Sequence, residues 1–325
     1  MADNRERETL QLFDLMFKLI LKEASSTARV RFINGLFDKN YPPDSETTFA
    51  ATESVSNQGE RLEKLTSDMV IMIGGDAFLI EAQINDDETI AVRVFQYGFA
   101  HAVRTRQTTA GNLTTLTMPA ARIIYWETTR RTPDKETVRL VFPDKTTHDY
   151  EVEALKVLDQ SLVTLDRRDM ALLFPFCLLK FRREVKRTAV TVERRRELAG
   201  ELRVMLREME GFLAGELREG RLSVGDAAMI LERVEQMYEE LYGLYPEFEE
   251  AKVELQERLR THWQDYLQEG MQLGRQEGMQ LGRQEGMQLG RQEGMQLGEK
   301  RVVELLEQGY TLEQIKRMLT QEAVR

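Results

Sequence analysis

The sequence predicts an α/β fold with a mixed sheet, followed by a helical C-terminal region. Two short apolar runs flank a Gly-Gly pair and indicate a β-hairpin over residues 69–84. A helical segment and a third apolar run follow at 90–103 and 121–126. This strand–helix–strand order implies a crossover that places the third strand parallel beside the hairpin. From residue 191 the pattern is long, charged and helical.

The hairpin determines which residues face each other. Its two runs and turn are Met69–Ile73, Ala77–Ile84 and Gly74-Gly75-Asp76. A two-residue Gly74-Gly75 loop pairs Ile73 with Asp76, because glycine readily adopts the positive φ of a tight turn. The ladder then runs back until Asp68 faces Glu81. A four-residue loop keeps this register, whereas a three-residue loop breaks it.

Two facing carboxylates on this hairpin indicate a cation site. Because side chains alternate along a strand, Leu79, Glu81 and Gln83 share one face, opposite to Phe78, Ile80, Ala82 and Ile84. Facing acids repel by some tenths of a kcal/mol. A hard divalent cation such as Mg²⁺ between Asp68 and Glu81 would remove that repulsion. The alternative is that both acids lie on a solvated face.

Several short motifs resemble one nuclease family. Asp68 and, after the hairpin, Glu81-Ala82-Gln83 resemble the PD-(D/E)XK signature of the recombination-promoting nuclease and transposase-like family. Asp14-Leu15-Met16-Phe17-Lys18 resembles its N-terminal "D..FK" element, and Arg93 with Tyr97 resembles its "R...Y" helix. The glycine repeats and the closing LLEQGYTLEQIKRML are similar to tails in that family. The resemblance covers about half the chain, from near residue 9 to near 160, plus the tail. Gln83 departs from the signature, which has Lys there, although glutamine is a familiar variant.

The resemblance implies a restriction-endonuclease-like αβββαβ core and a divalent-metal-dependent DNA endonuclease linked to recombination or mobile-element processing. Asp68 and Glu81 would hold Mg²⁺ or Mn²⁺, and Gln83 would orient a water molecule. The accessory candidates are Lys18, Arg93, Tyr97 and Asp14. A second hypothesis is a decayed nuclease fold that binds DNA or protein without catalysis, which Gln83 and the acidic net charge favour.

Each accessory residue also has a structural interpretation. Asp14, Lys18 and Lys22 are spaced four apart, which suits a row of helix ion pairs as well as a metal site. Arg93 could bind a phosphate, orient a site carboxylate or form a helix–sheet ion pair. His101 has no histidine or cysteine near it in the sequence, so we expect a surface or core residue.

Composition bounds the class of protein. The chain has 325 residues, a net charge of −10 and one cysteine, Cys177. A lone cysteine excludes a disulfide framework and favours a reducing cytoplasm. The sequence contains no run of about eighteen apolar residues, so it predicts no membrane-spanning helix. Its N-terminus does not resemble a signal peptide. The sequence contains no P-loop, no G-x-S-x-G elbow and no C-x-x-C pair.

The remaining elements follow from periodicity. We expect helices over 8–23, with Leu10, Phe13, Phe17, Ile20 and Leu21 buried, and over 26–37. Residues 47–55 suggest an edge strand. The helix at 90–103 is expected to bury Val92, Phe95, Phe99 and Val103. A second hairpin is predicted from 138–142 and 148–152, with helical sequence beyond Glu153.

The C-terminal half divides into three predicted segments after a domain of residues 1–160. They are a helical region at 161–268, an EGMQLGRQ glycine-repeat spacer at 269–300 and a helical tail at 301–325. Two basic clusters, at 182–187 and 194–196, are candidates for DNA contact or solvated helix faces. The C-terminal helices could also form a homo-oligomer.

Overall fold

The computed structural model describes residues 2–50, 53–58, 61–66, 69–83, 89–109, 113–187 and 190–257. These belong to a compact unit, Met1–Trp263, and a second unit comprises Gln264–Arg325. Asp68, the glycine repeats and the predicted tail lie outside the described residues. The predicted division at residues 160, 268 and 300 stays a prediction.

A six-stranded mixed sheet forms the centre of the α/β fold, in the order β1-β4-β5-β8-β10-β9. Its strands are β1 (Thr47–Phe49), β4 (Met69–Ile73), β5 (Asp76–Gln83), β8 (Ala120–Tyr125), β9 (Lys135–Val141) and β10 (Thr147–Lys156). β5, β8 and β10 run parallel, and the other neighbours are antiparallel. Two further hairpins are β2 (Glu53–Gln58) with β3 (Arg61–Thr66), and β6 (Gln107–Thr108) with β7 (Thr114–Thr115). The predicted α/β class and mixed sheet are confirmed.

The predicted hairpin register is confirmed for every described pair, from Ile73 opposite Asp76 to Met69 opposite Ile80. Gly74 and Gly75 form the turn with φ of 58° and 95°, values that cost L-residues energy and glycine little. The predicted crossover is also confirmed, because α3 (Ile90–Arg104) joins β5 to the parallel β8.

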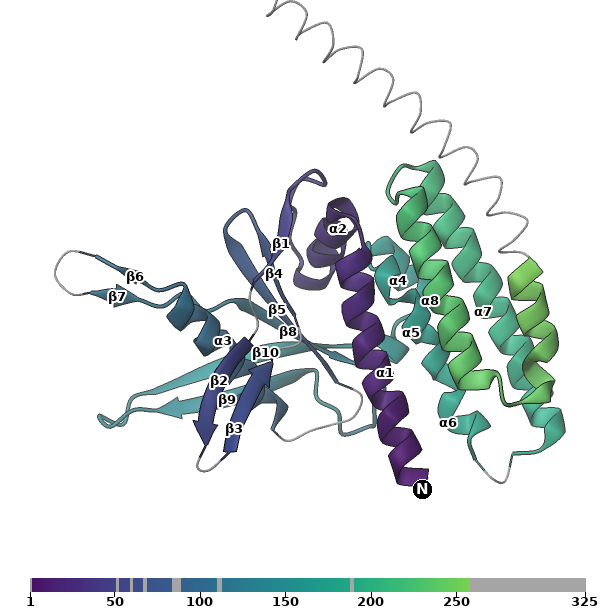
Figure 1. The fold of residues 1–325 in the computed structure, drawn as a ribbon, viewed down its shortest axis with the longest axis horizontal. Helices are drawn as coiled ribbons and strands as arrows, with labels where there is room; N and C mark the ends of the chain where they lie inside the picture. Colours follow the sequence, from purple (N-terminus) through teal and green to yellow (C-terminus); the bar gives the residue numbers. More distant parts are fainter. Residues whose placement is uncertain are drawn as a thin grey trace, which may run out of the picture. The chain divides into compact units, whose positions relative to one another are not determined.

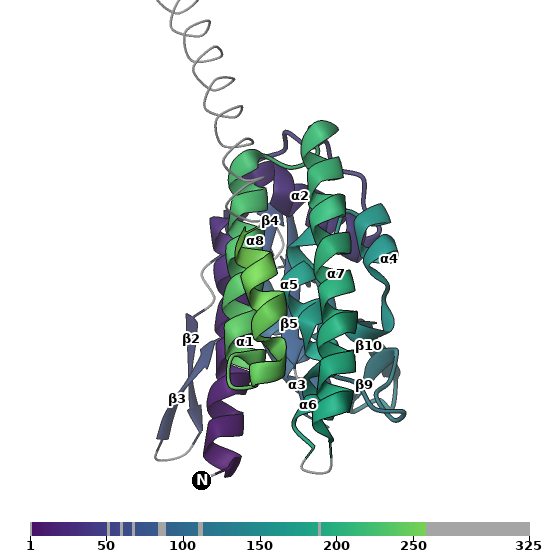
Figure 2. The same ribbon diagram turned by 90° about the vertical axis from the view of Figure 1, so that its right-hand side faces the viewer.

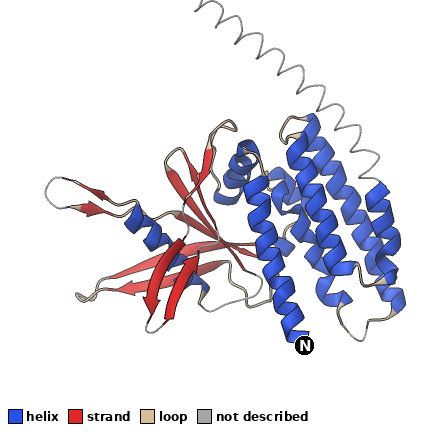
Figure 3. Cartoon of the chain, viewed as in Figure 1, coloured by secondary structure: helices blue, strands red, loops and turns tan. Residues whose placement is uncertain are grey.

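Most helices lie on one side of the sheet (Figure 3). The long helices are α1 (Ala2–Glu23), α2 (Ser26–Phe37), α7 (Val192–Arg218) and α8 (Val224–Tyr242). The short elements are η1 (Val157–Asp159), α4 (Leu162–Arg167), η2 (Ala171–Leu173), α5 (Phe174–Cys177), η3 (Leu178–Phe181), α6 (Arg182–Val185) and η4 (Pro246–Phe248). Ser25, Thr191 and Ser223 cap α2, α7 and α8 with their hydroxyl groups. α1 lies between the sheet and α8 (Figure 1), and α7 runs beside α8 in both views (Figure 2).

Two apolar cores cover the two faces of the sheet. The larger contains the even-numbered residues of β5, Phe78, Ile80 and Ala82, with the apolar side of α1 and the later helices. The smaller contains Leu79 from β5 and residues of α3, β8 and β10. The predicted alternation along β5 is therefore confirmed for the described residues, and Glu81 and Gln83 belong to the face that α3 covers.

The lengths of two predicted strands differ from the structure. The predicted edge strand over 47–55 is confirmed only for β1, which lies at one edge of the sheet and ends at Phe49. β2 begins at Glu53 in a separate hairpin. β10 continues to Lys156, although helical sequence was expected beyond Glu153.

The inward face of α3 was also predicted wrongly. Val92 and Phe99 are each 46% exposed, whereas Ala91, Gly98 and Ala102 are buried. α3 packs so closely that a Cβ at Gly98 would lie 3.0 Å from Met118 Cε. Ile90 and Val94 supply the apolar contacts of α3 in the smaller core, and small side chains stand beside them in place of Val92 and Phe99.

Candidate functional site

A polar cluster lies where the three parallel strands end. Gln83, Tyr125 and Lys156 are near the carboxyl ends of β5, β8 and β10 and are neighbours in the strand register. All three belong by alternation to the face that α3 covers. In open α/β sheets, ligands bind outside the carboxyl ends of parallel strands. This edge is therefore the candidate functional site.

Glu81, Gln83 and Arg93 form the centre of the cluster. Arg93, on the first turn of α3, donates from one nitrogen, Nη2, to Glu81 Oε1 at 2.7 Å and to Gln83 Oε1 at 3.0 Å. The Glu81 side chain is only 5% exposed, whereas that of Arg93 is 31% exposed. A buried carboxylate needs a compensating charge, and the guanidinium supplies it. The predicted helix–sheet ion pair of Arg93 is confirmed.

Sequence reasoning missed two acid-containing contacts at the same edge. Tyr125 Oη donates to Glu136 Oε1 at 3.0 Å, and Lys156 Nζ pairs with Asp134 Oδ1 at 2.7 Å. The period-2 pattern of β10 could have found Lys156, because it shares a face with Tyr150, Val152 and Ala154 once the strand is extended. The contact between Tyr125 and Glu136 joins β8 to β9 across β10, which no local pattern indicates.

The other predicted site residues lie elsewhere or outside the described chain. Lys18 Nζ pairs with Asp14 Oδ2 at 2.7 Å, so the predicted i,i+4 ion pair on α1 is confirmed. The apolar residues of α1 belong to the core on the sheet face opposite to Glu81. Tyr97 packs against the smaller core, on the α3 face. The predicted pairing of Asp68 with Glu81 cannot be placed, because Asp68 lies outside the described residues.

The donor set can be compared with the needs of a divalent cation. Glu81 Oε1 and Gln83 Oε1 converge on one cationic nitrogen, which stands where a metal ion could contact both oxygens. Mg²⁺ prefers such hard oxygen ligands at shorter distances, with water and phosphate completing its shell. The described residues contain no group of three or more His, Cys, Asp or Glu side chains that could hold a metal. The two oxygens thus fit part of a site, and further ligands are required.

The basic clusters near residue 190 mainly form internal ion pairs. Glu127 accepts from Arg182 Nη1 and Arg183 Nε, both at 2.7 Å, and joins the end of β8 to α6. Arg194 pairs with Glu184 at 2.8 Å. Since these guanidinium groups already have carboxylate partners, the solvated or structural interpretation is favoured over DNA contact.

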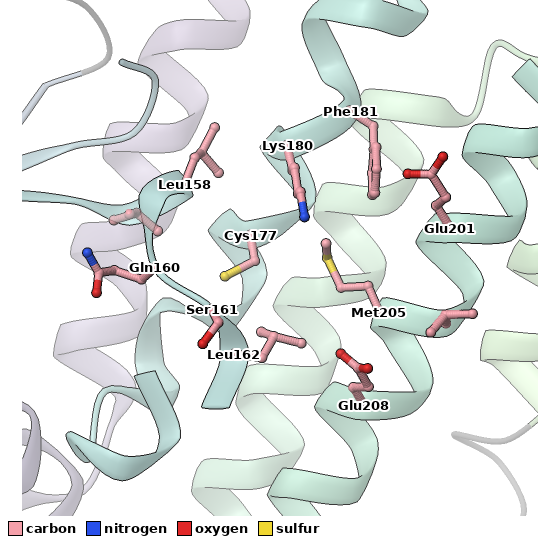
Figure 4. Close-up of a pocket in the computed structure, with 12 residues that line it drawn as sticks. Leu158, Gln160, Ser161, Leu162, Cys177, Lys180, Phe181, Glu201, Met205 and Glu208 are labelled. Atoms are coloured by element: carbon pink, nitrogen blue, oxygen red, sulfur yellow. The ribbon is translucent and has the colours of Figure 1, made fainter. Parts of the chain in front are cut away.

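A hollow of about 360 Å³ lies on the helical side of the molecule. Figure 4 shows Lys180 from η3 and Met205 from α7 reaching toward each other, with Cys177 beside them. Burial raises the pKa of the Cys177 thiol to about 12, so this thiol is a poor nucleophile at neutral pH. Cys177 is a core residue with 5% exposure.

Comparisons with protein-family models, with curated proteins and with solved structures found no match. No helix in the described part of the chain has both the length and the apolar character to cross a membrane.

Proposed function

We propose that the protein is a divalent-metal-dependent DNA endonuclease with a restriction-endonuclease-like core of the PD-(D/E)XK type. The observation that carries the proposal is the convergence of Glu81 Oε1 and Gln83 Oε1 on one positive centre, Arg93 Nη2. The resemblance of the motifs supports it, as does the order of hairpin, crossover helix and parallel strand. By the same likeness, the activity serves recombination or mobile-element processing, and the single cysteine favours the cytoplasm as its location.

In this proposal, Asp68 and Glu81 hold Mg²⁺ or Mn²⁺, and Gln83 contributes an amide oxygen. The metal supplies Lewis-acid stabilisation of the phosphate and a lowered pKa for a bound water. Gln83 orients that water through a hydrogen bond but cannot exchange a proton with it. Arg93 orients Glu81, and its 31% exposed side chain can turn toward a DNA phosphate.

Nicking of supercoiled plasmid tests the proposal. The purified protein is incubated with Mg²⁺ or Mn²⁺, alongside Asp68→Ala, Glu81→Gln and the control Glu151→Ala, which removes a 52% exposed carboxylate on β10. We expect the wild type and the control to nick, and both site variants to lose at least about a hundredfold in rate. Equal nicking by all four proteins would remove the enzymatic assignment from this site.

A noncatalytic DNA- or protein-binding module is the second candidate. Its support is that Arg93 already neutralises Glu81 and that Gln83 carries no charge. This candidate predicts DNA retention in a gel-shift assay without nicking in either metal.

Self-association through the C-terminal helices remains a separate proposal. It predicts that a chain ending at residue 268 has a smaller oligomeric mass than the full chain, measured by light scattering.

A further inference from the structure

A second cavity of about 360 Å³ lies at the other end of the sheet. Lys39 and Tyr41 come from the segment after α2, Asp76 from the hairpin turn, His101 from α3 and Gln107 from β6. β5 begins at this cavity, and Asp76 there lies five residues before Glu81, about 17 Å at 3.3 Å per residue. The cavity is therefore not part of the proposed nuclease site.

His101 gives this cavity a buried polar group that lacks a described protein partner. The residue is 4% exposed and lines the cavity. Within the described residues its imidazole has no hydrogen-bond partner, and only its backbone carbonyl accepts a bond, from Thr105. Burial, and then the charge of Arg104, lower the pKa of His101, so the ring is neutral at pH 7. A neutral imidazole offers one donor and one acceptor to a ligand in the cavity.

The mouth of the cavity carries one positive charge that has no ion-pair partner among the described residues, the ammonium group of Lys39. The cavity also contains a negative charge, the carboxylate of Asp76. It accepts a hydrogen bond from Tyr41 Oη, which holds the phenol in place. Burial, together with this bond, raises the pKa of Tyr41 to about 12. A ligand with an anionic group can thus bind at Lys39 while the Tyr41–Asp76 pair stays closed.

The wall beside these groups is apolar. Apolar side chains line it from both faces of the sheet: Met72 and Met118 on the α3 side, and Phe78 on the other. The Tyr41 ring packs edge-on against Phe78 with centroids 5.8 Å apart. Thioethers and aromatic rings suit a flat, polarisable group. The amide of Gln107 adds a donor and an acceptor near that wall. The cavity volume falls within the range typical of small-molecule sites.

We propose that this cavity binds a nucleoside monophosphate, with the phosphate at Lys39, the base against the methionines and its polar edge at His101. A ligand with a phosphate, a flat body and mixed donors and acceptors satisfies all three kinds of lining group. The inference does not depend on nuclease activity, because none of its residues belongs to the Glu81 cluster.

Proton NMR of the histidine rings tests this site in the full-length protein. The chain has three histidines, and a His101→Asn variant identifies the His101 signal. Titration with dAMP, dGMP, dCMP and TMP should shift that signal, because the polar edge of the base would form a hydrogen bond with the imidazole. Inorganic phosphate and ribose 5-phosphate form the comparison arms, and His148→Asn is the control for a surface ring.

Lys39→Ala should weaken binding of the best nucleotide about tenfold through loss of a charge-assisted contact. Lys135→Ala, which removes a 45% exposed lysine on β9, should not change it. Glu81→Gln should bind the nucleotide like the wild type, which separates this proposal from the nuclease. Equal shifts with inorganic phosphate would reduce the site to an anion site and overturn the proposal. Absence of any shift, or an unaltered affinity in Lys39→Ala, would also overturn it.

Discussion

Two buried carboxylates, Glu81 and Glu127, each face arginine, but their arginines are held differently. Both oxygens of Glu127 accept bonds from guanidinium groups, and Arg182 is only 3% exposed. Glu81 shares one nitrogen of Arg93 with Gln83, and Arg93 is 31% exposed. Burial of an acid therefore does not by itself indicate function. Glu127 keeps one fully buried partner, Arg182, beside the 47% exposed Arg183, and that buried partner marks a fixed structural link. The arginine that Glu81 shares with Gln83 is partly exposed, which suits a site that can exchange its cation.

The largest expected effect is on the Glu127 link. Arg182→Ala should lower the free energy of unfolding by about 3–5 kcal/mol, because it leaves a buried carboxylate short of a partner. Urea denaturation measures this loss. Arg194→Ala, in a pair whose side chains are 39% and 38% exposed, is the control and should cost much less, because water screens an exposed ion pair. Equal losses in the two variants would contradict the structural role of Arg182.

A third buried acid, Glu216, sharpens the comparison because another carboxyl group, Asp166, lies beside it. Burial, opposed by the charge of Arg221 and reinforced by Asp166, raises the pKa of Glu216 to about 7. The folded state thus favours the protonated form. This group stabilises the fold fully below its ordinary pKa of 4.5, and that contribution is lost as pH rises through about 7.

Glu216→Gln should remove this pH dependence. The stability of the wild type relative to the variant should fall by on the order of 2 kcal/mol between pH 4.5 and pH 8. Urea unfolding of both proteins at a series of pH values measures this difference in stability. The contributions of other titrating groups cancel, because both proteins contain them. A constant difference across this range would show that Glu216 titrates alike in both states.

Arg93→Ala should cost less than Arg182→Ala, about 1–2 kcal/mol, since water can reach the exposed side of the pair. If Arg93 and a metal ion compete for Glu81, Mg²⁺ should raise the melting temperature of Arg93→Ala more than that of the wild type. Arg182→Ala is the matched control and should gain no more from Mg²⁺ than the wild type. Thermal melts with and without Mg²⁺ test this, and equal gains in all three proteins would exclude competition at Glu81.

Much of the hairpin, but little of the site, was predictable from the sequence. Gly74-Gly75 allows one compact turn, and the period-2 alternation then places Glu81 and Gln83 on the same face as Leu79. The rotation of α3 was not predictable, because Val92 and Phe99 look like core residues and only close packing at Gly98 excludes them.

The contact of Tyr125 with Glu136 depends on β10 pairing with β8, a long-range choice that local patterns do not encode. The sequence did not determine which residue pairs with Glu81, for a related reason. Helix periodicity places Arg93 on one side of α3, but the angle of that helix on the sheet decides which group it contacts.

The smallest expected effect tests whether the Glu81 cluster extends to β9. Tyr125→Phe removes the hydroxyl that donates to Glu136 but keeps the ring in the smaller core. Loss of one hydrogen bond to a charged, partly exposed acceptor should cost about 0.5–1.5 kcal/mol in urea unfolding. The Mg²⁺-dependent rise in melting temperature should equal that of the wild type, because Glu81 and Arg93 keep their contact. A smaller rise would instead show that Tyr125 and Glu136 take part in binding the cation. The cation site would then extend from β5 to β9.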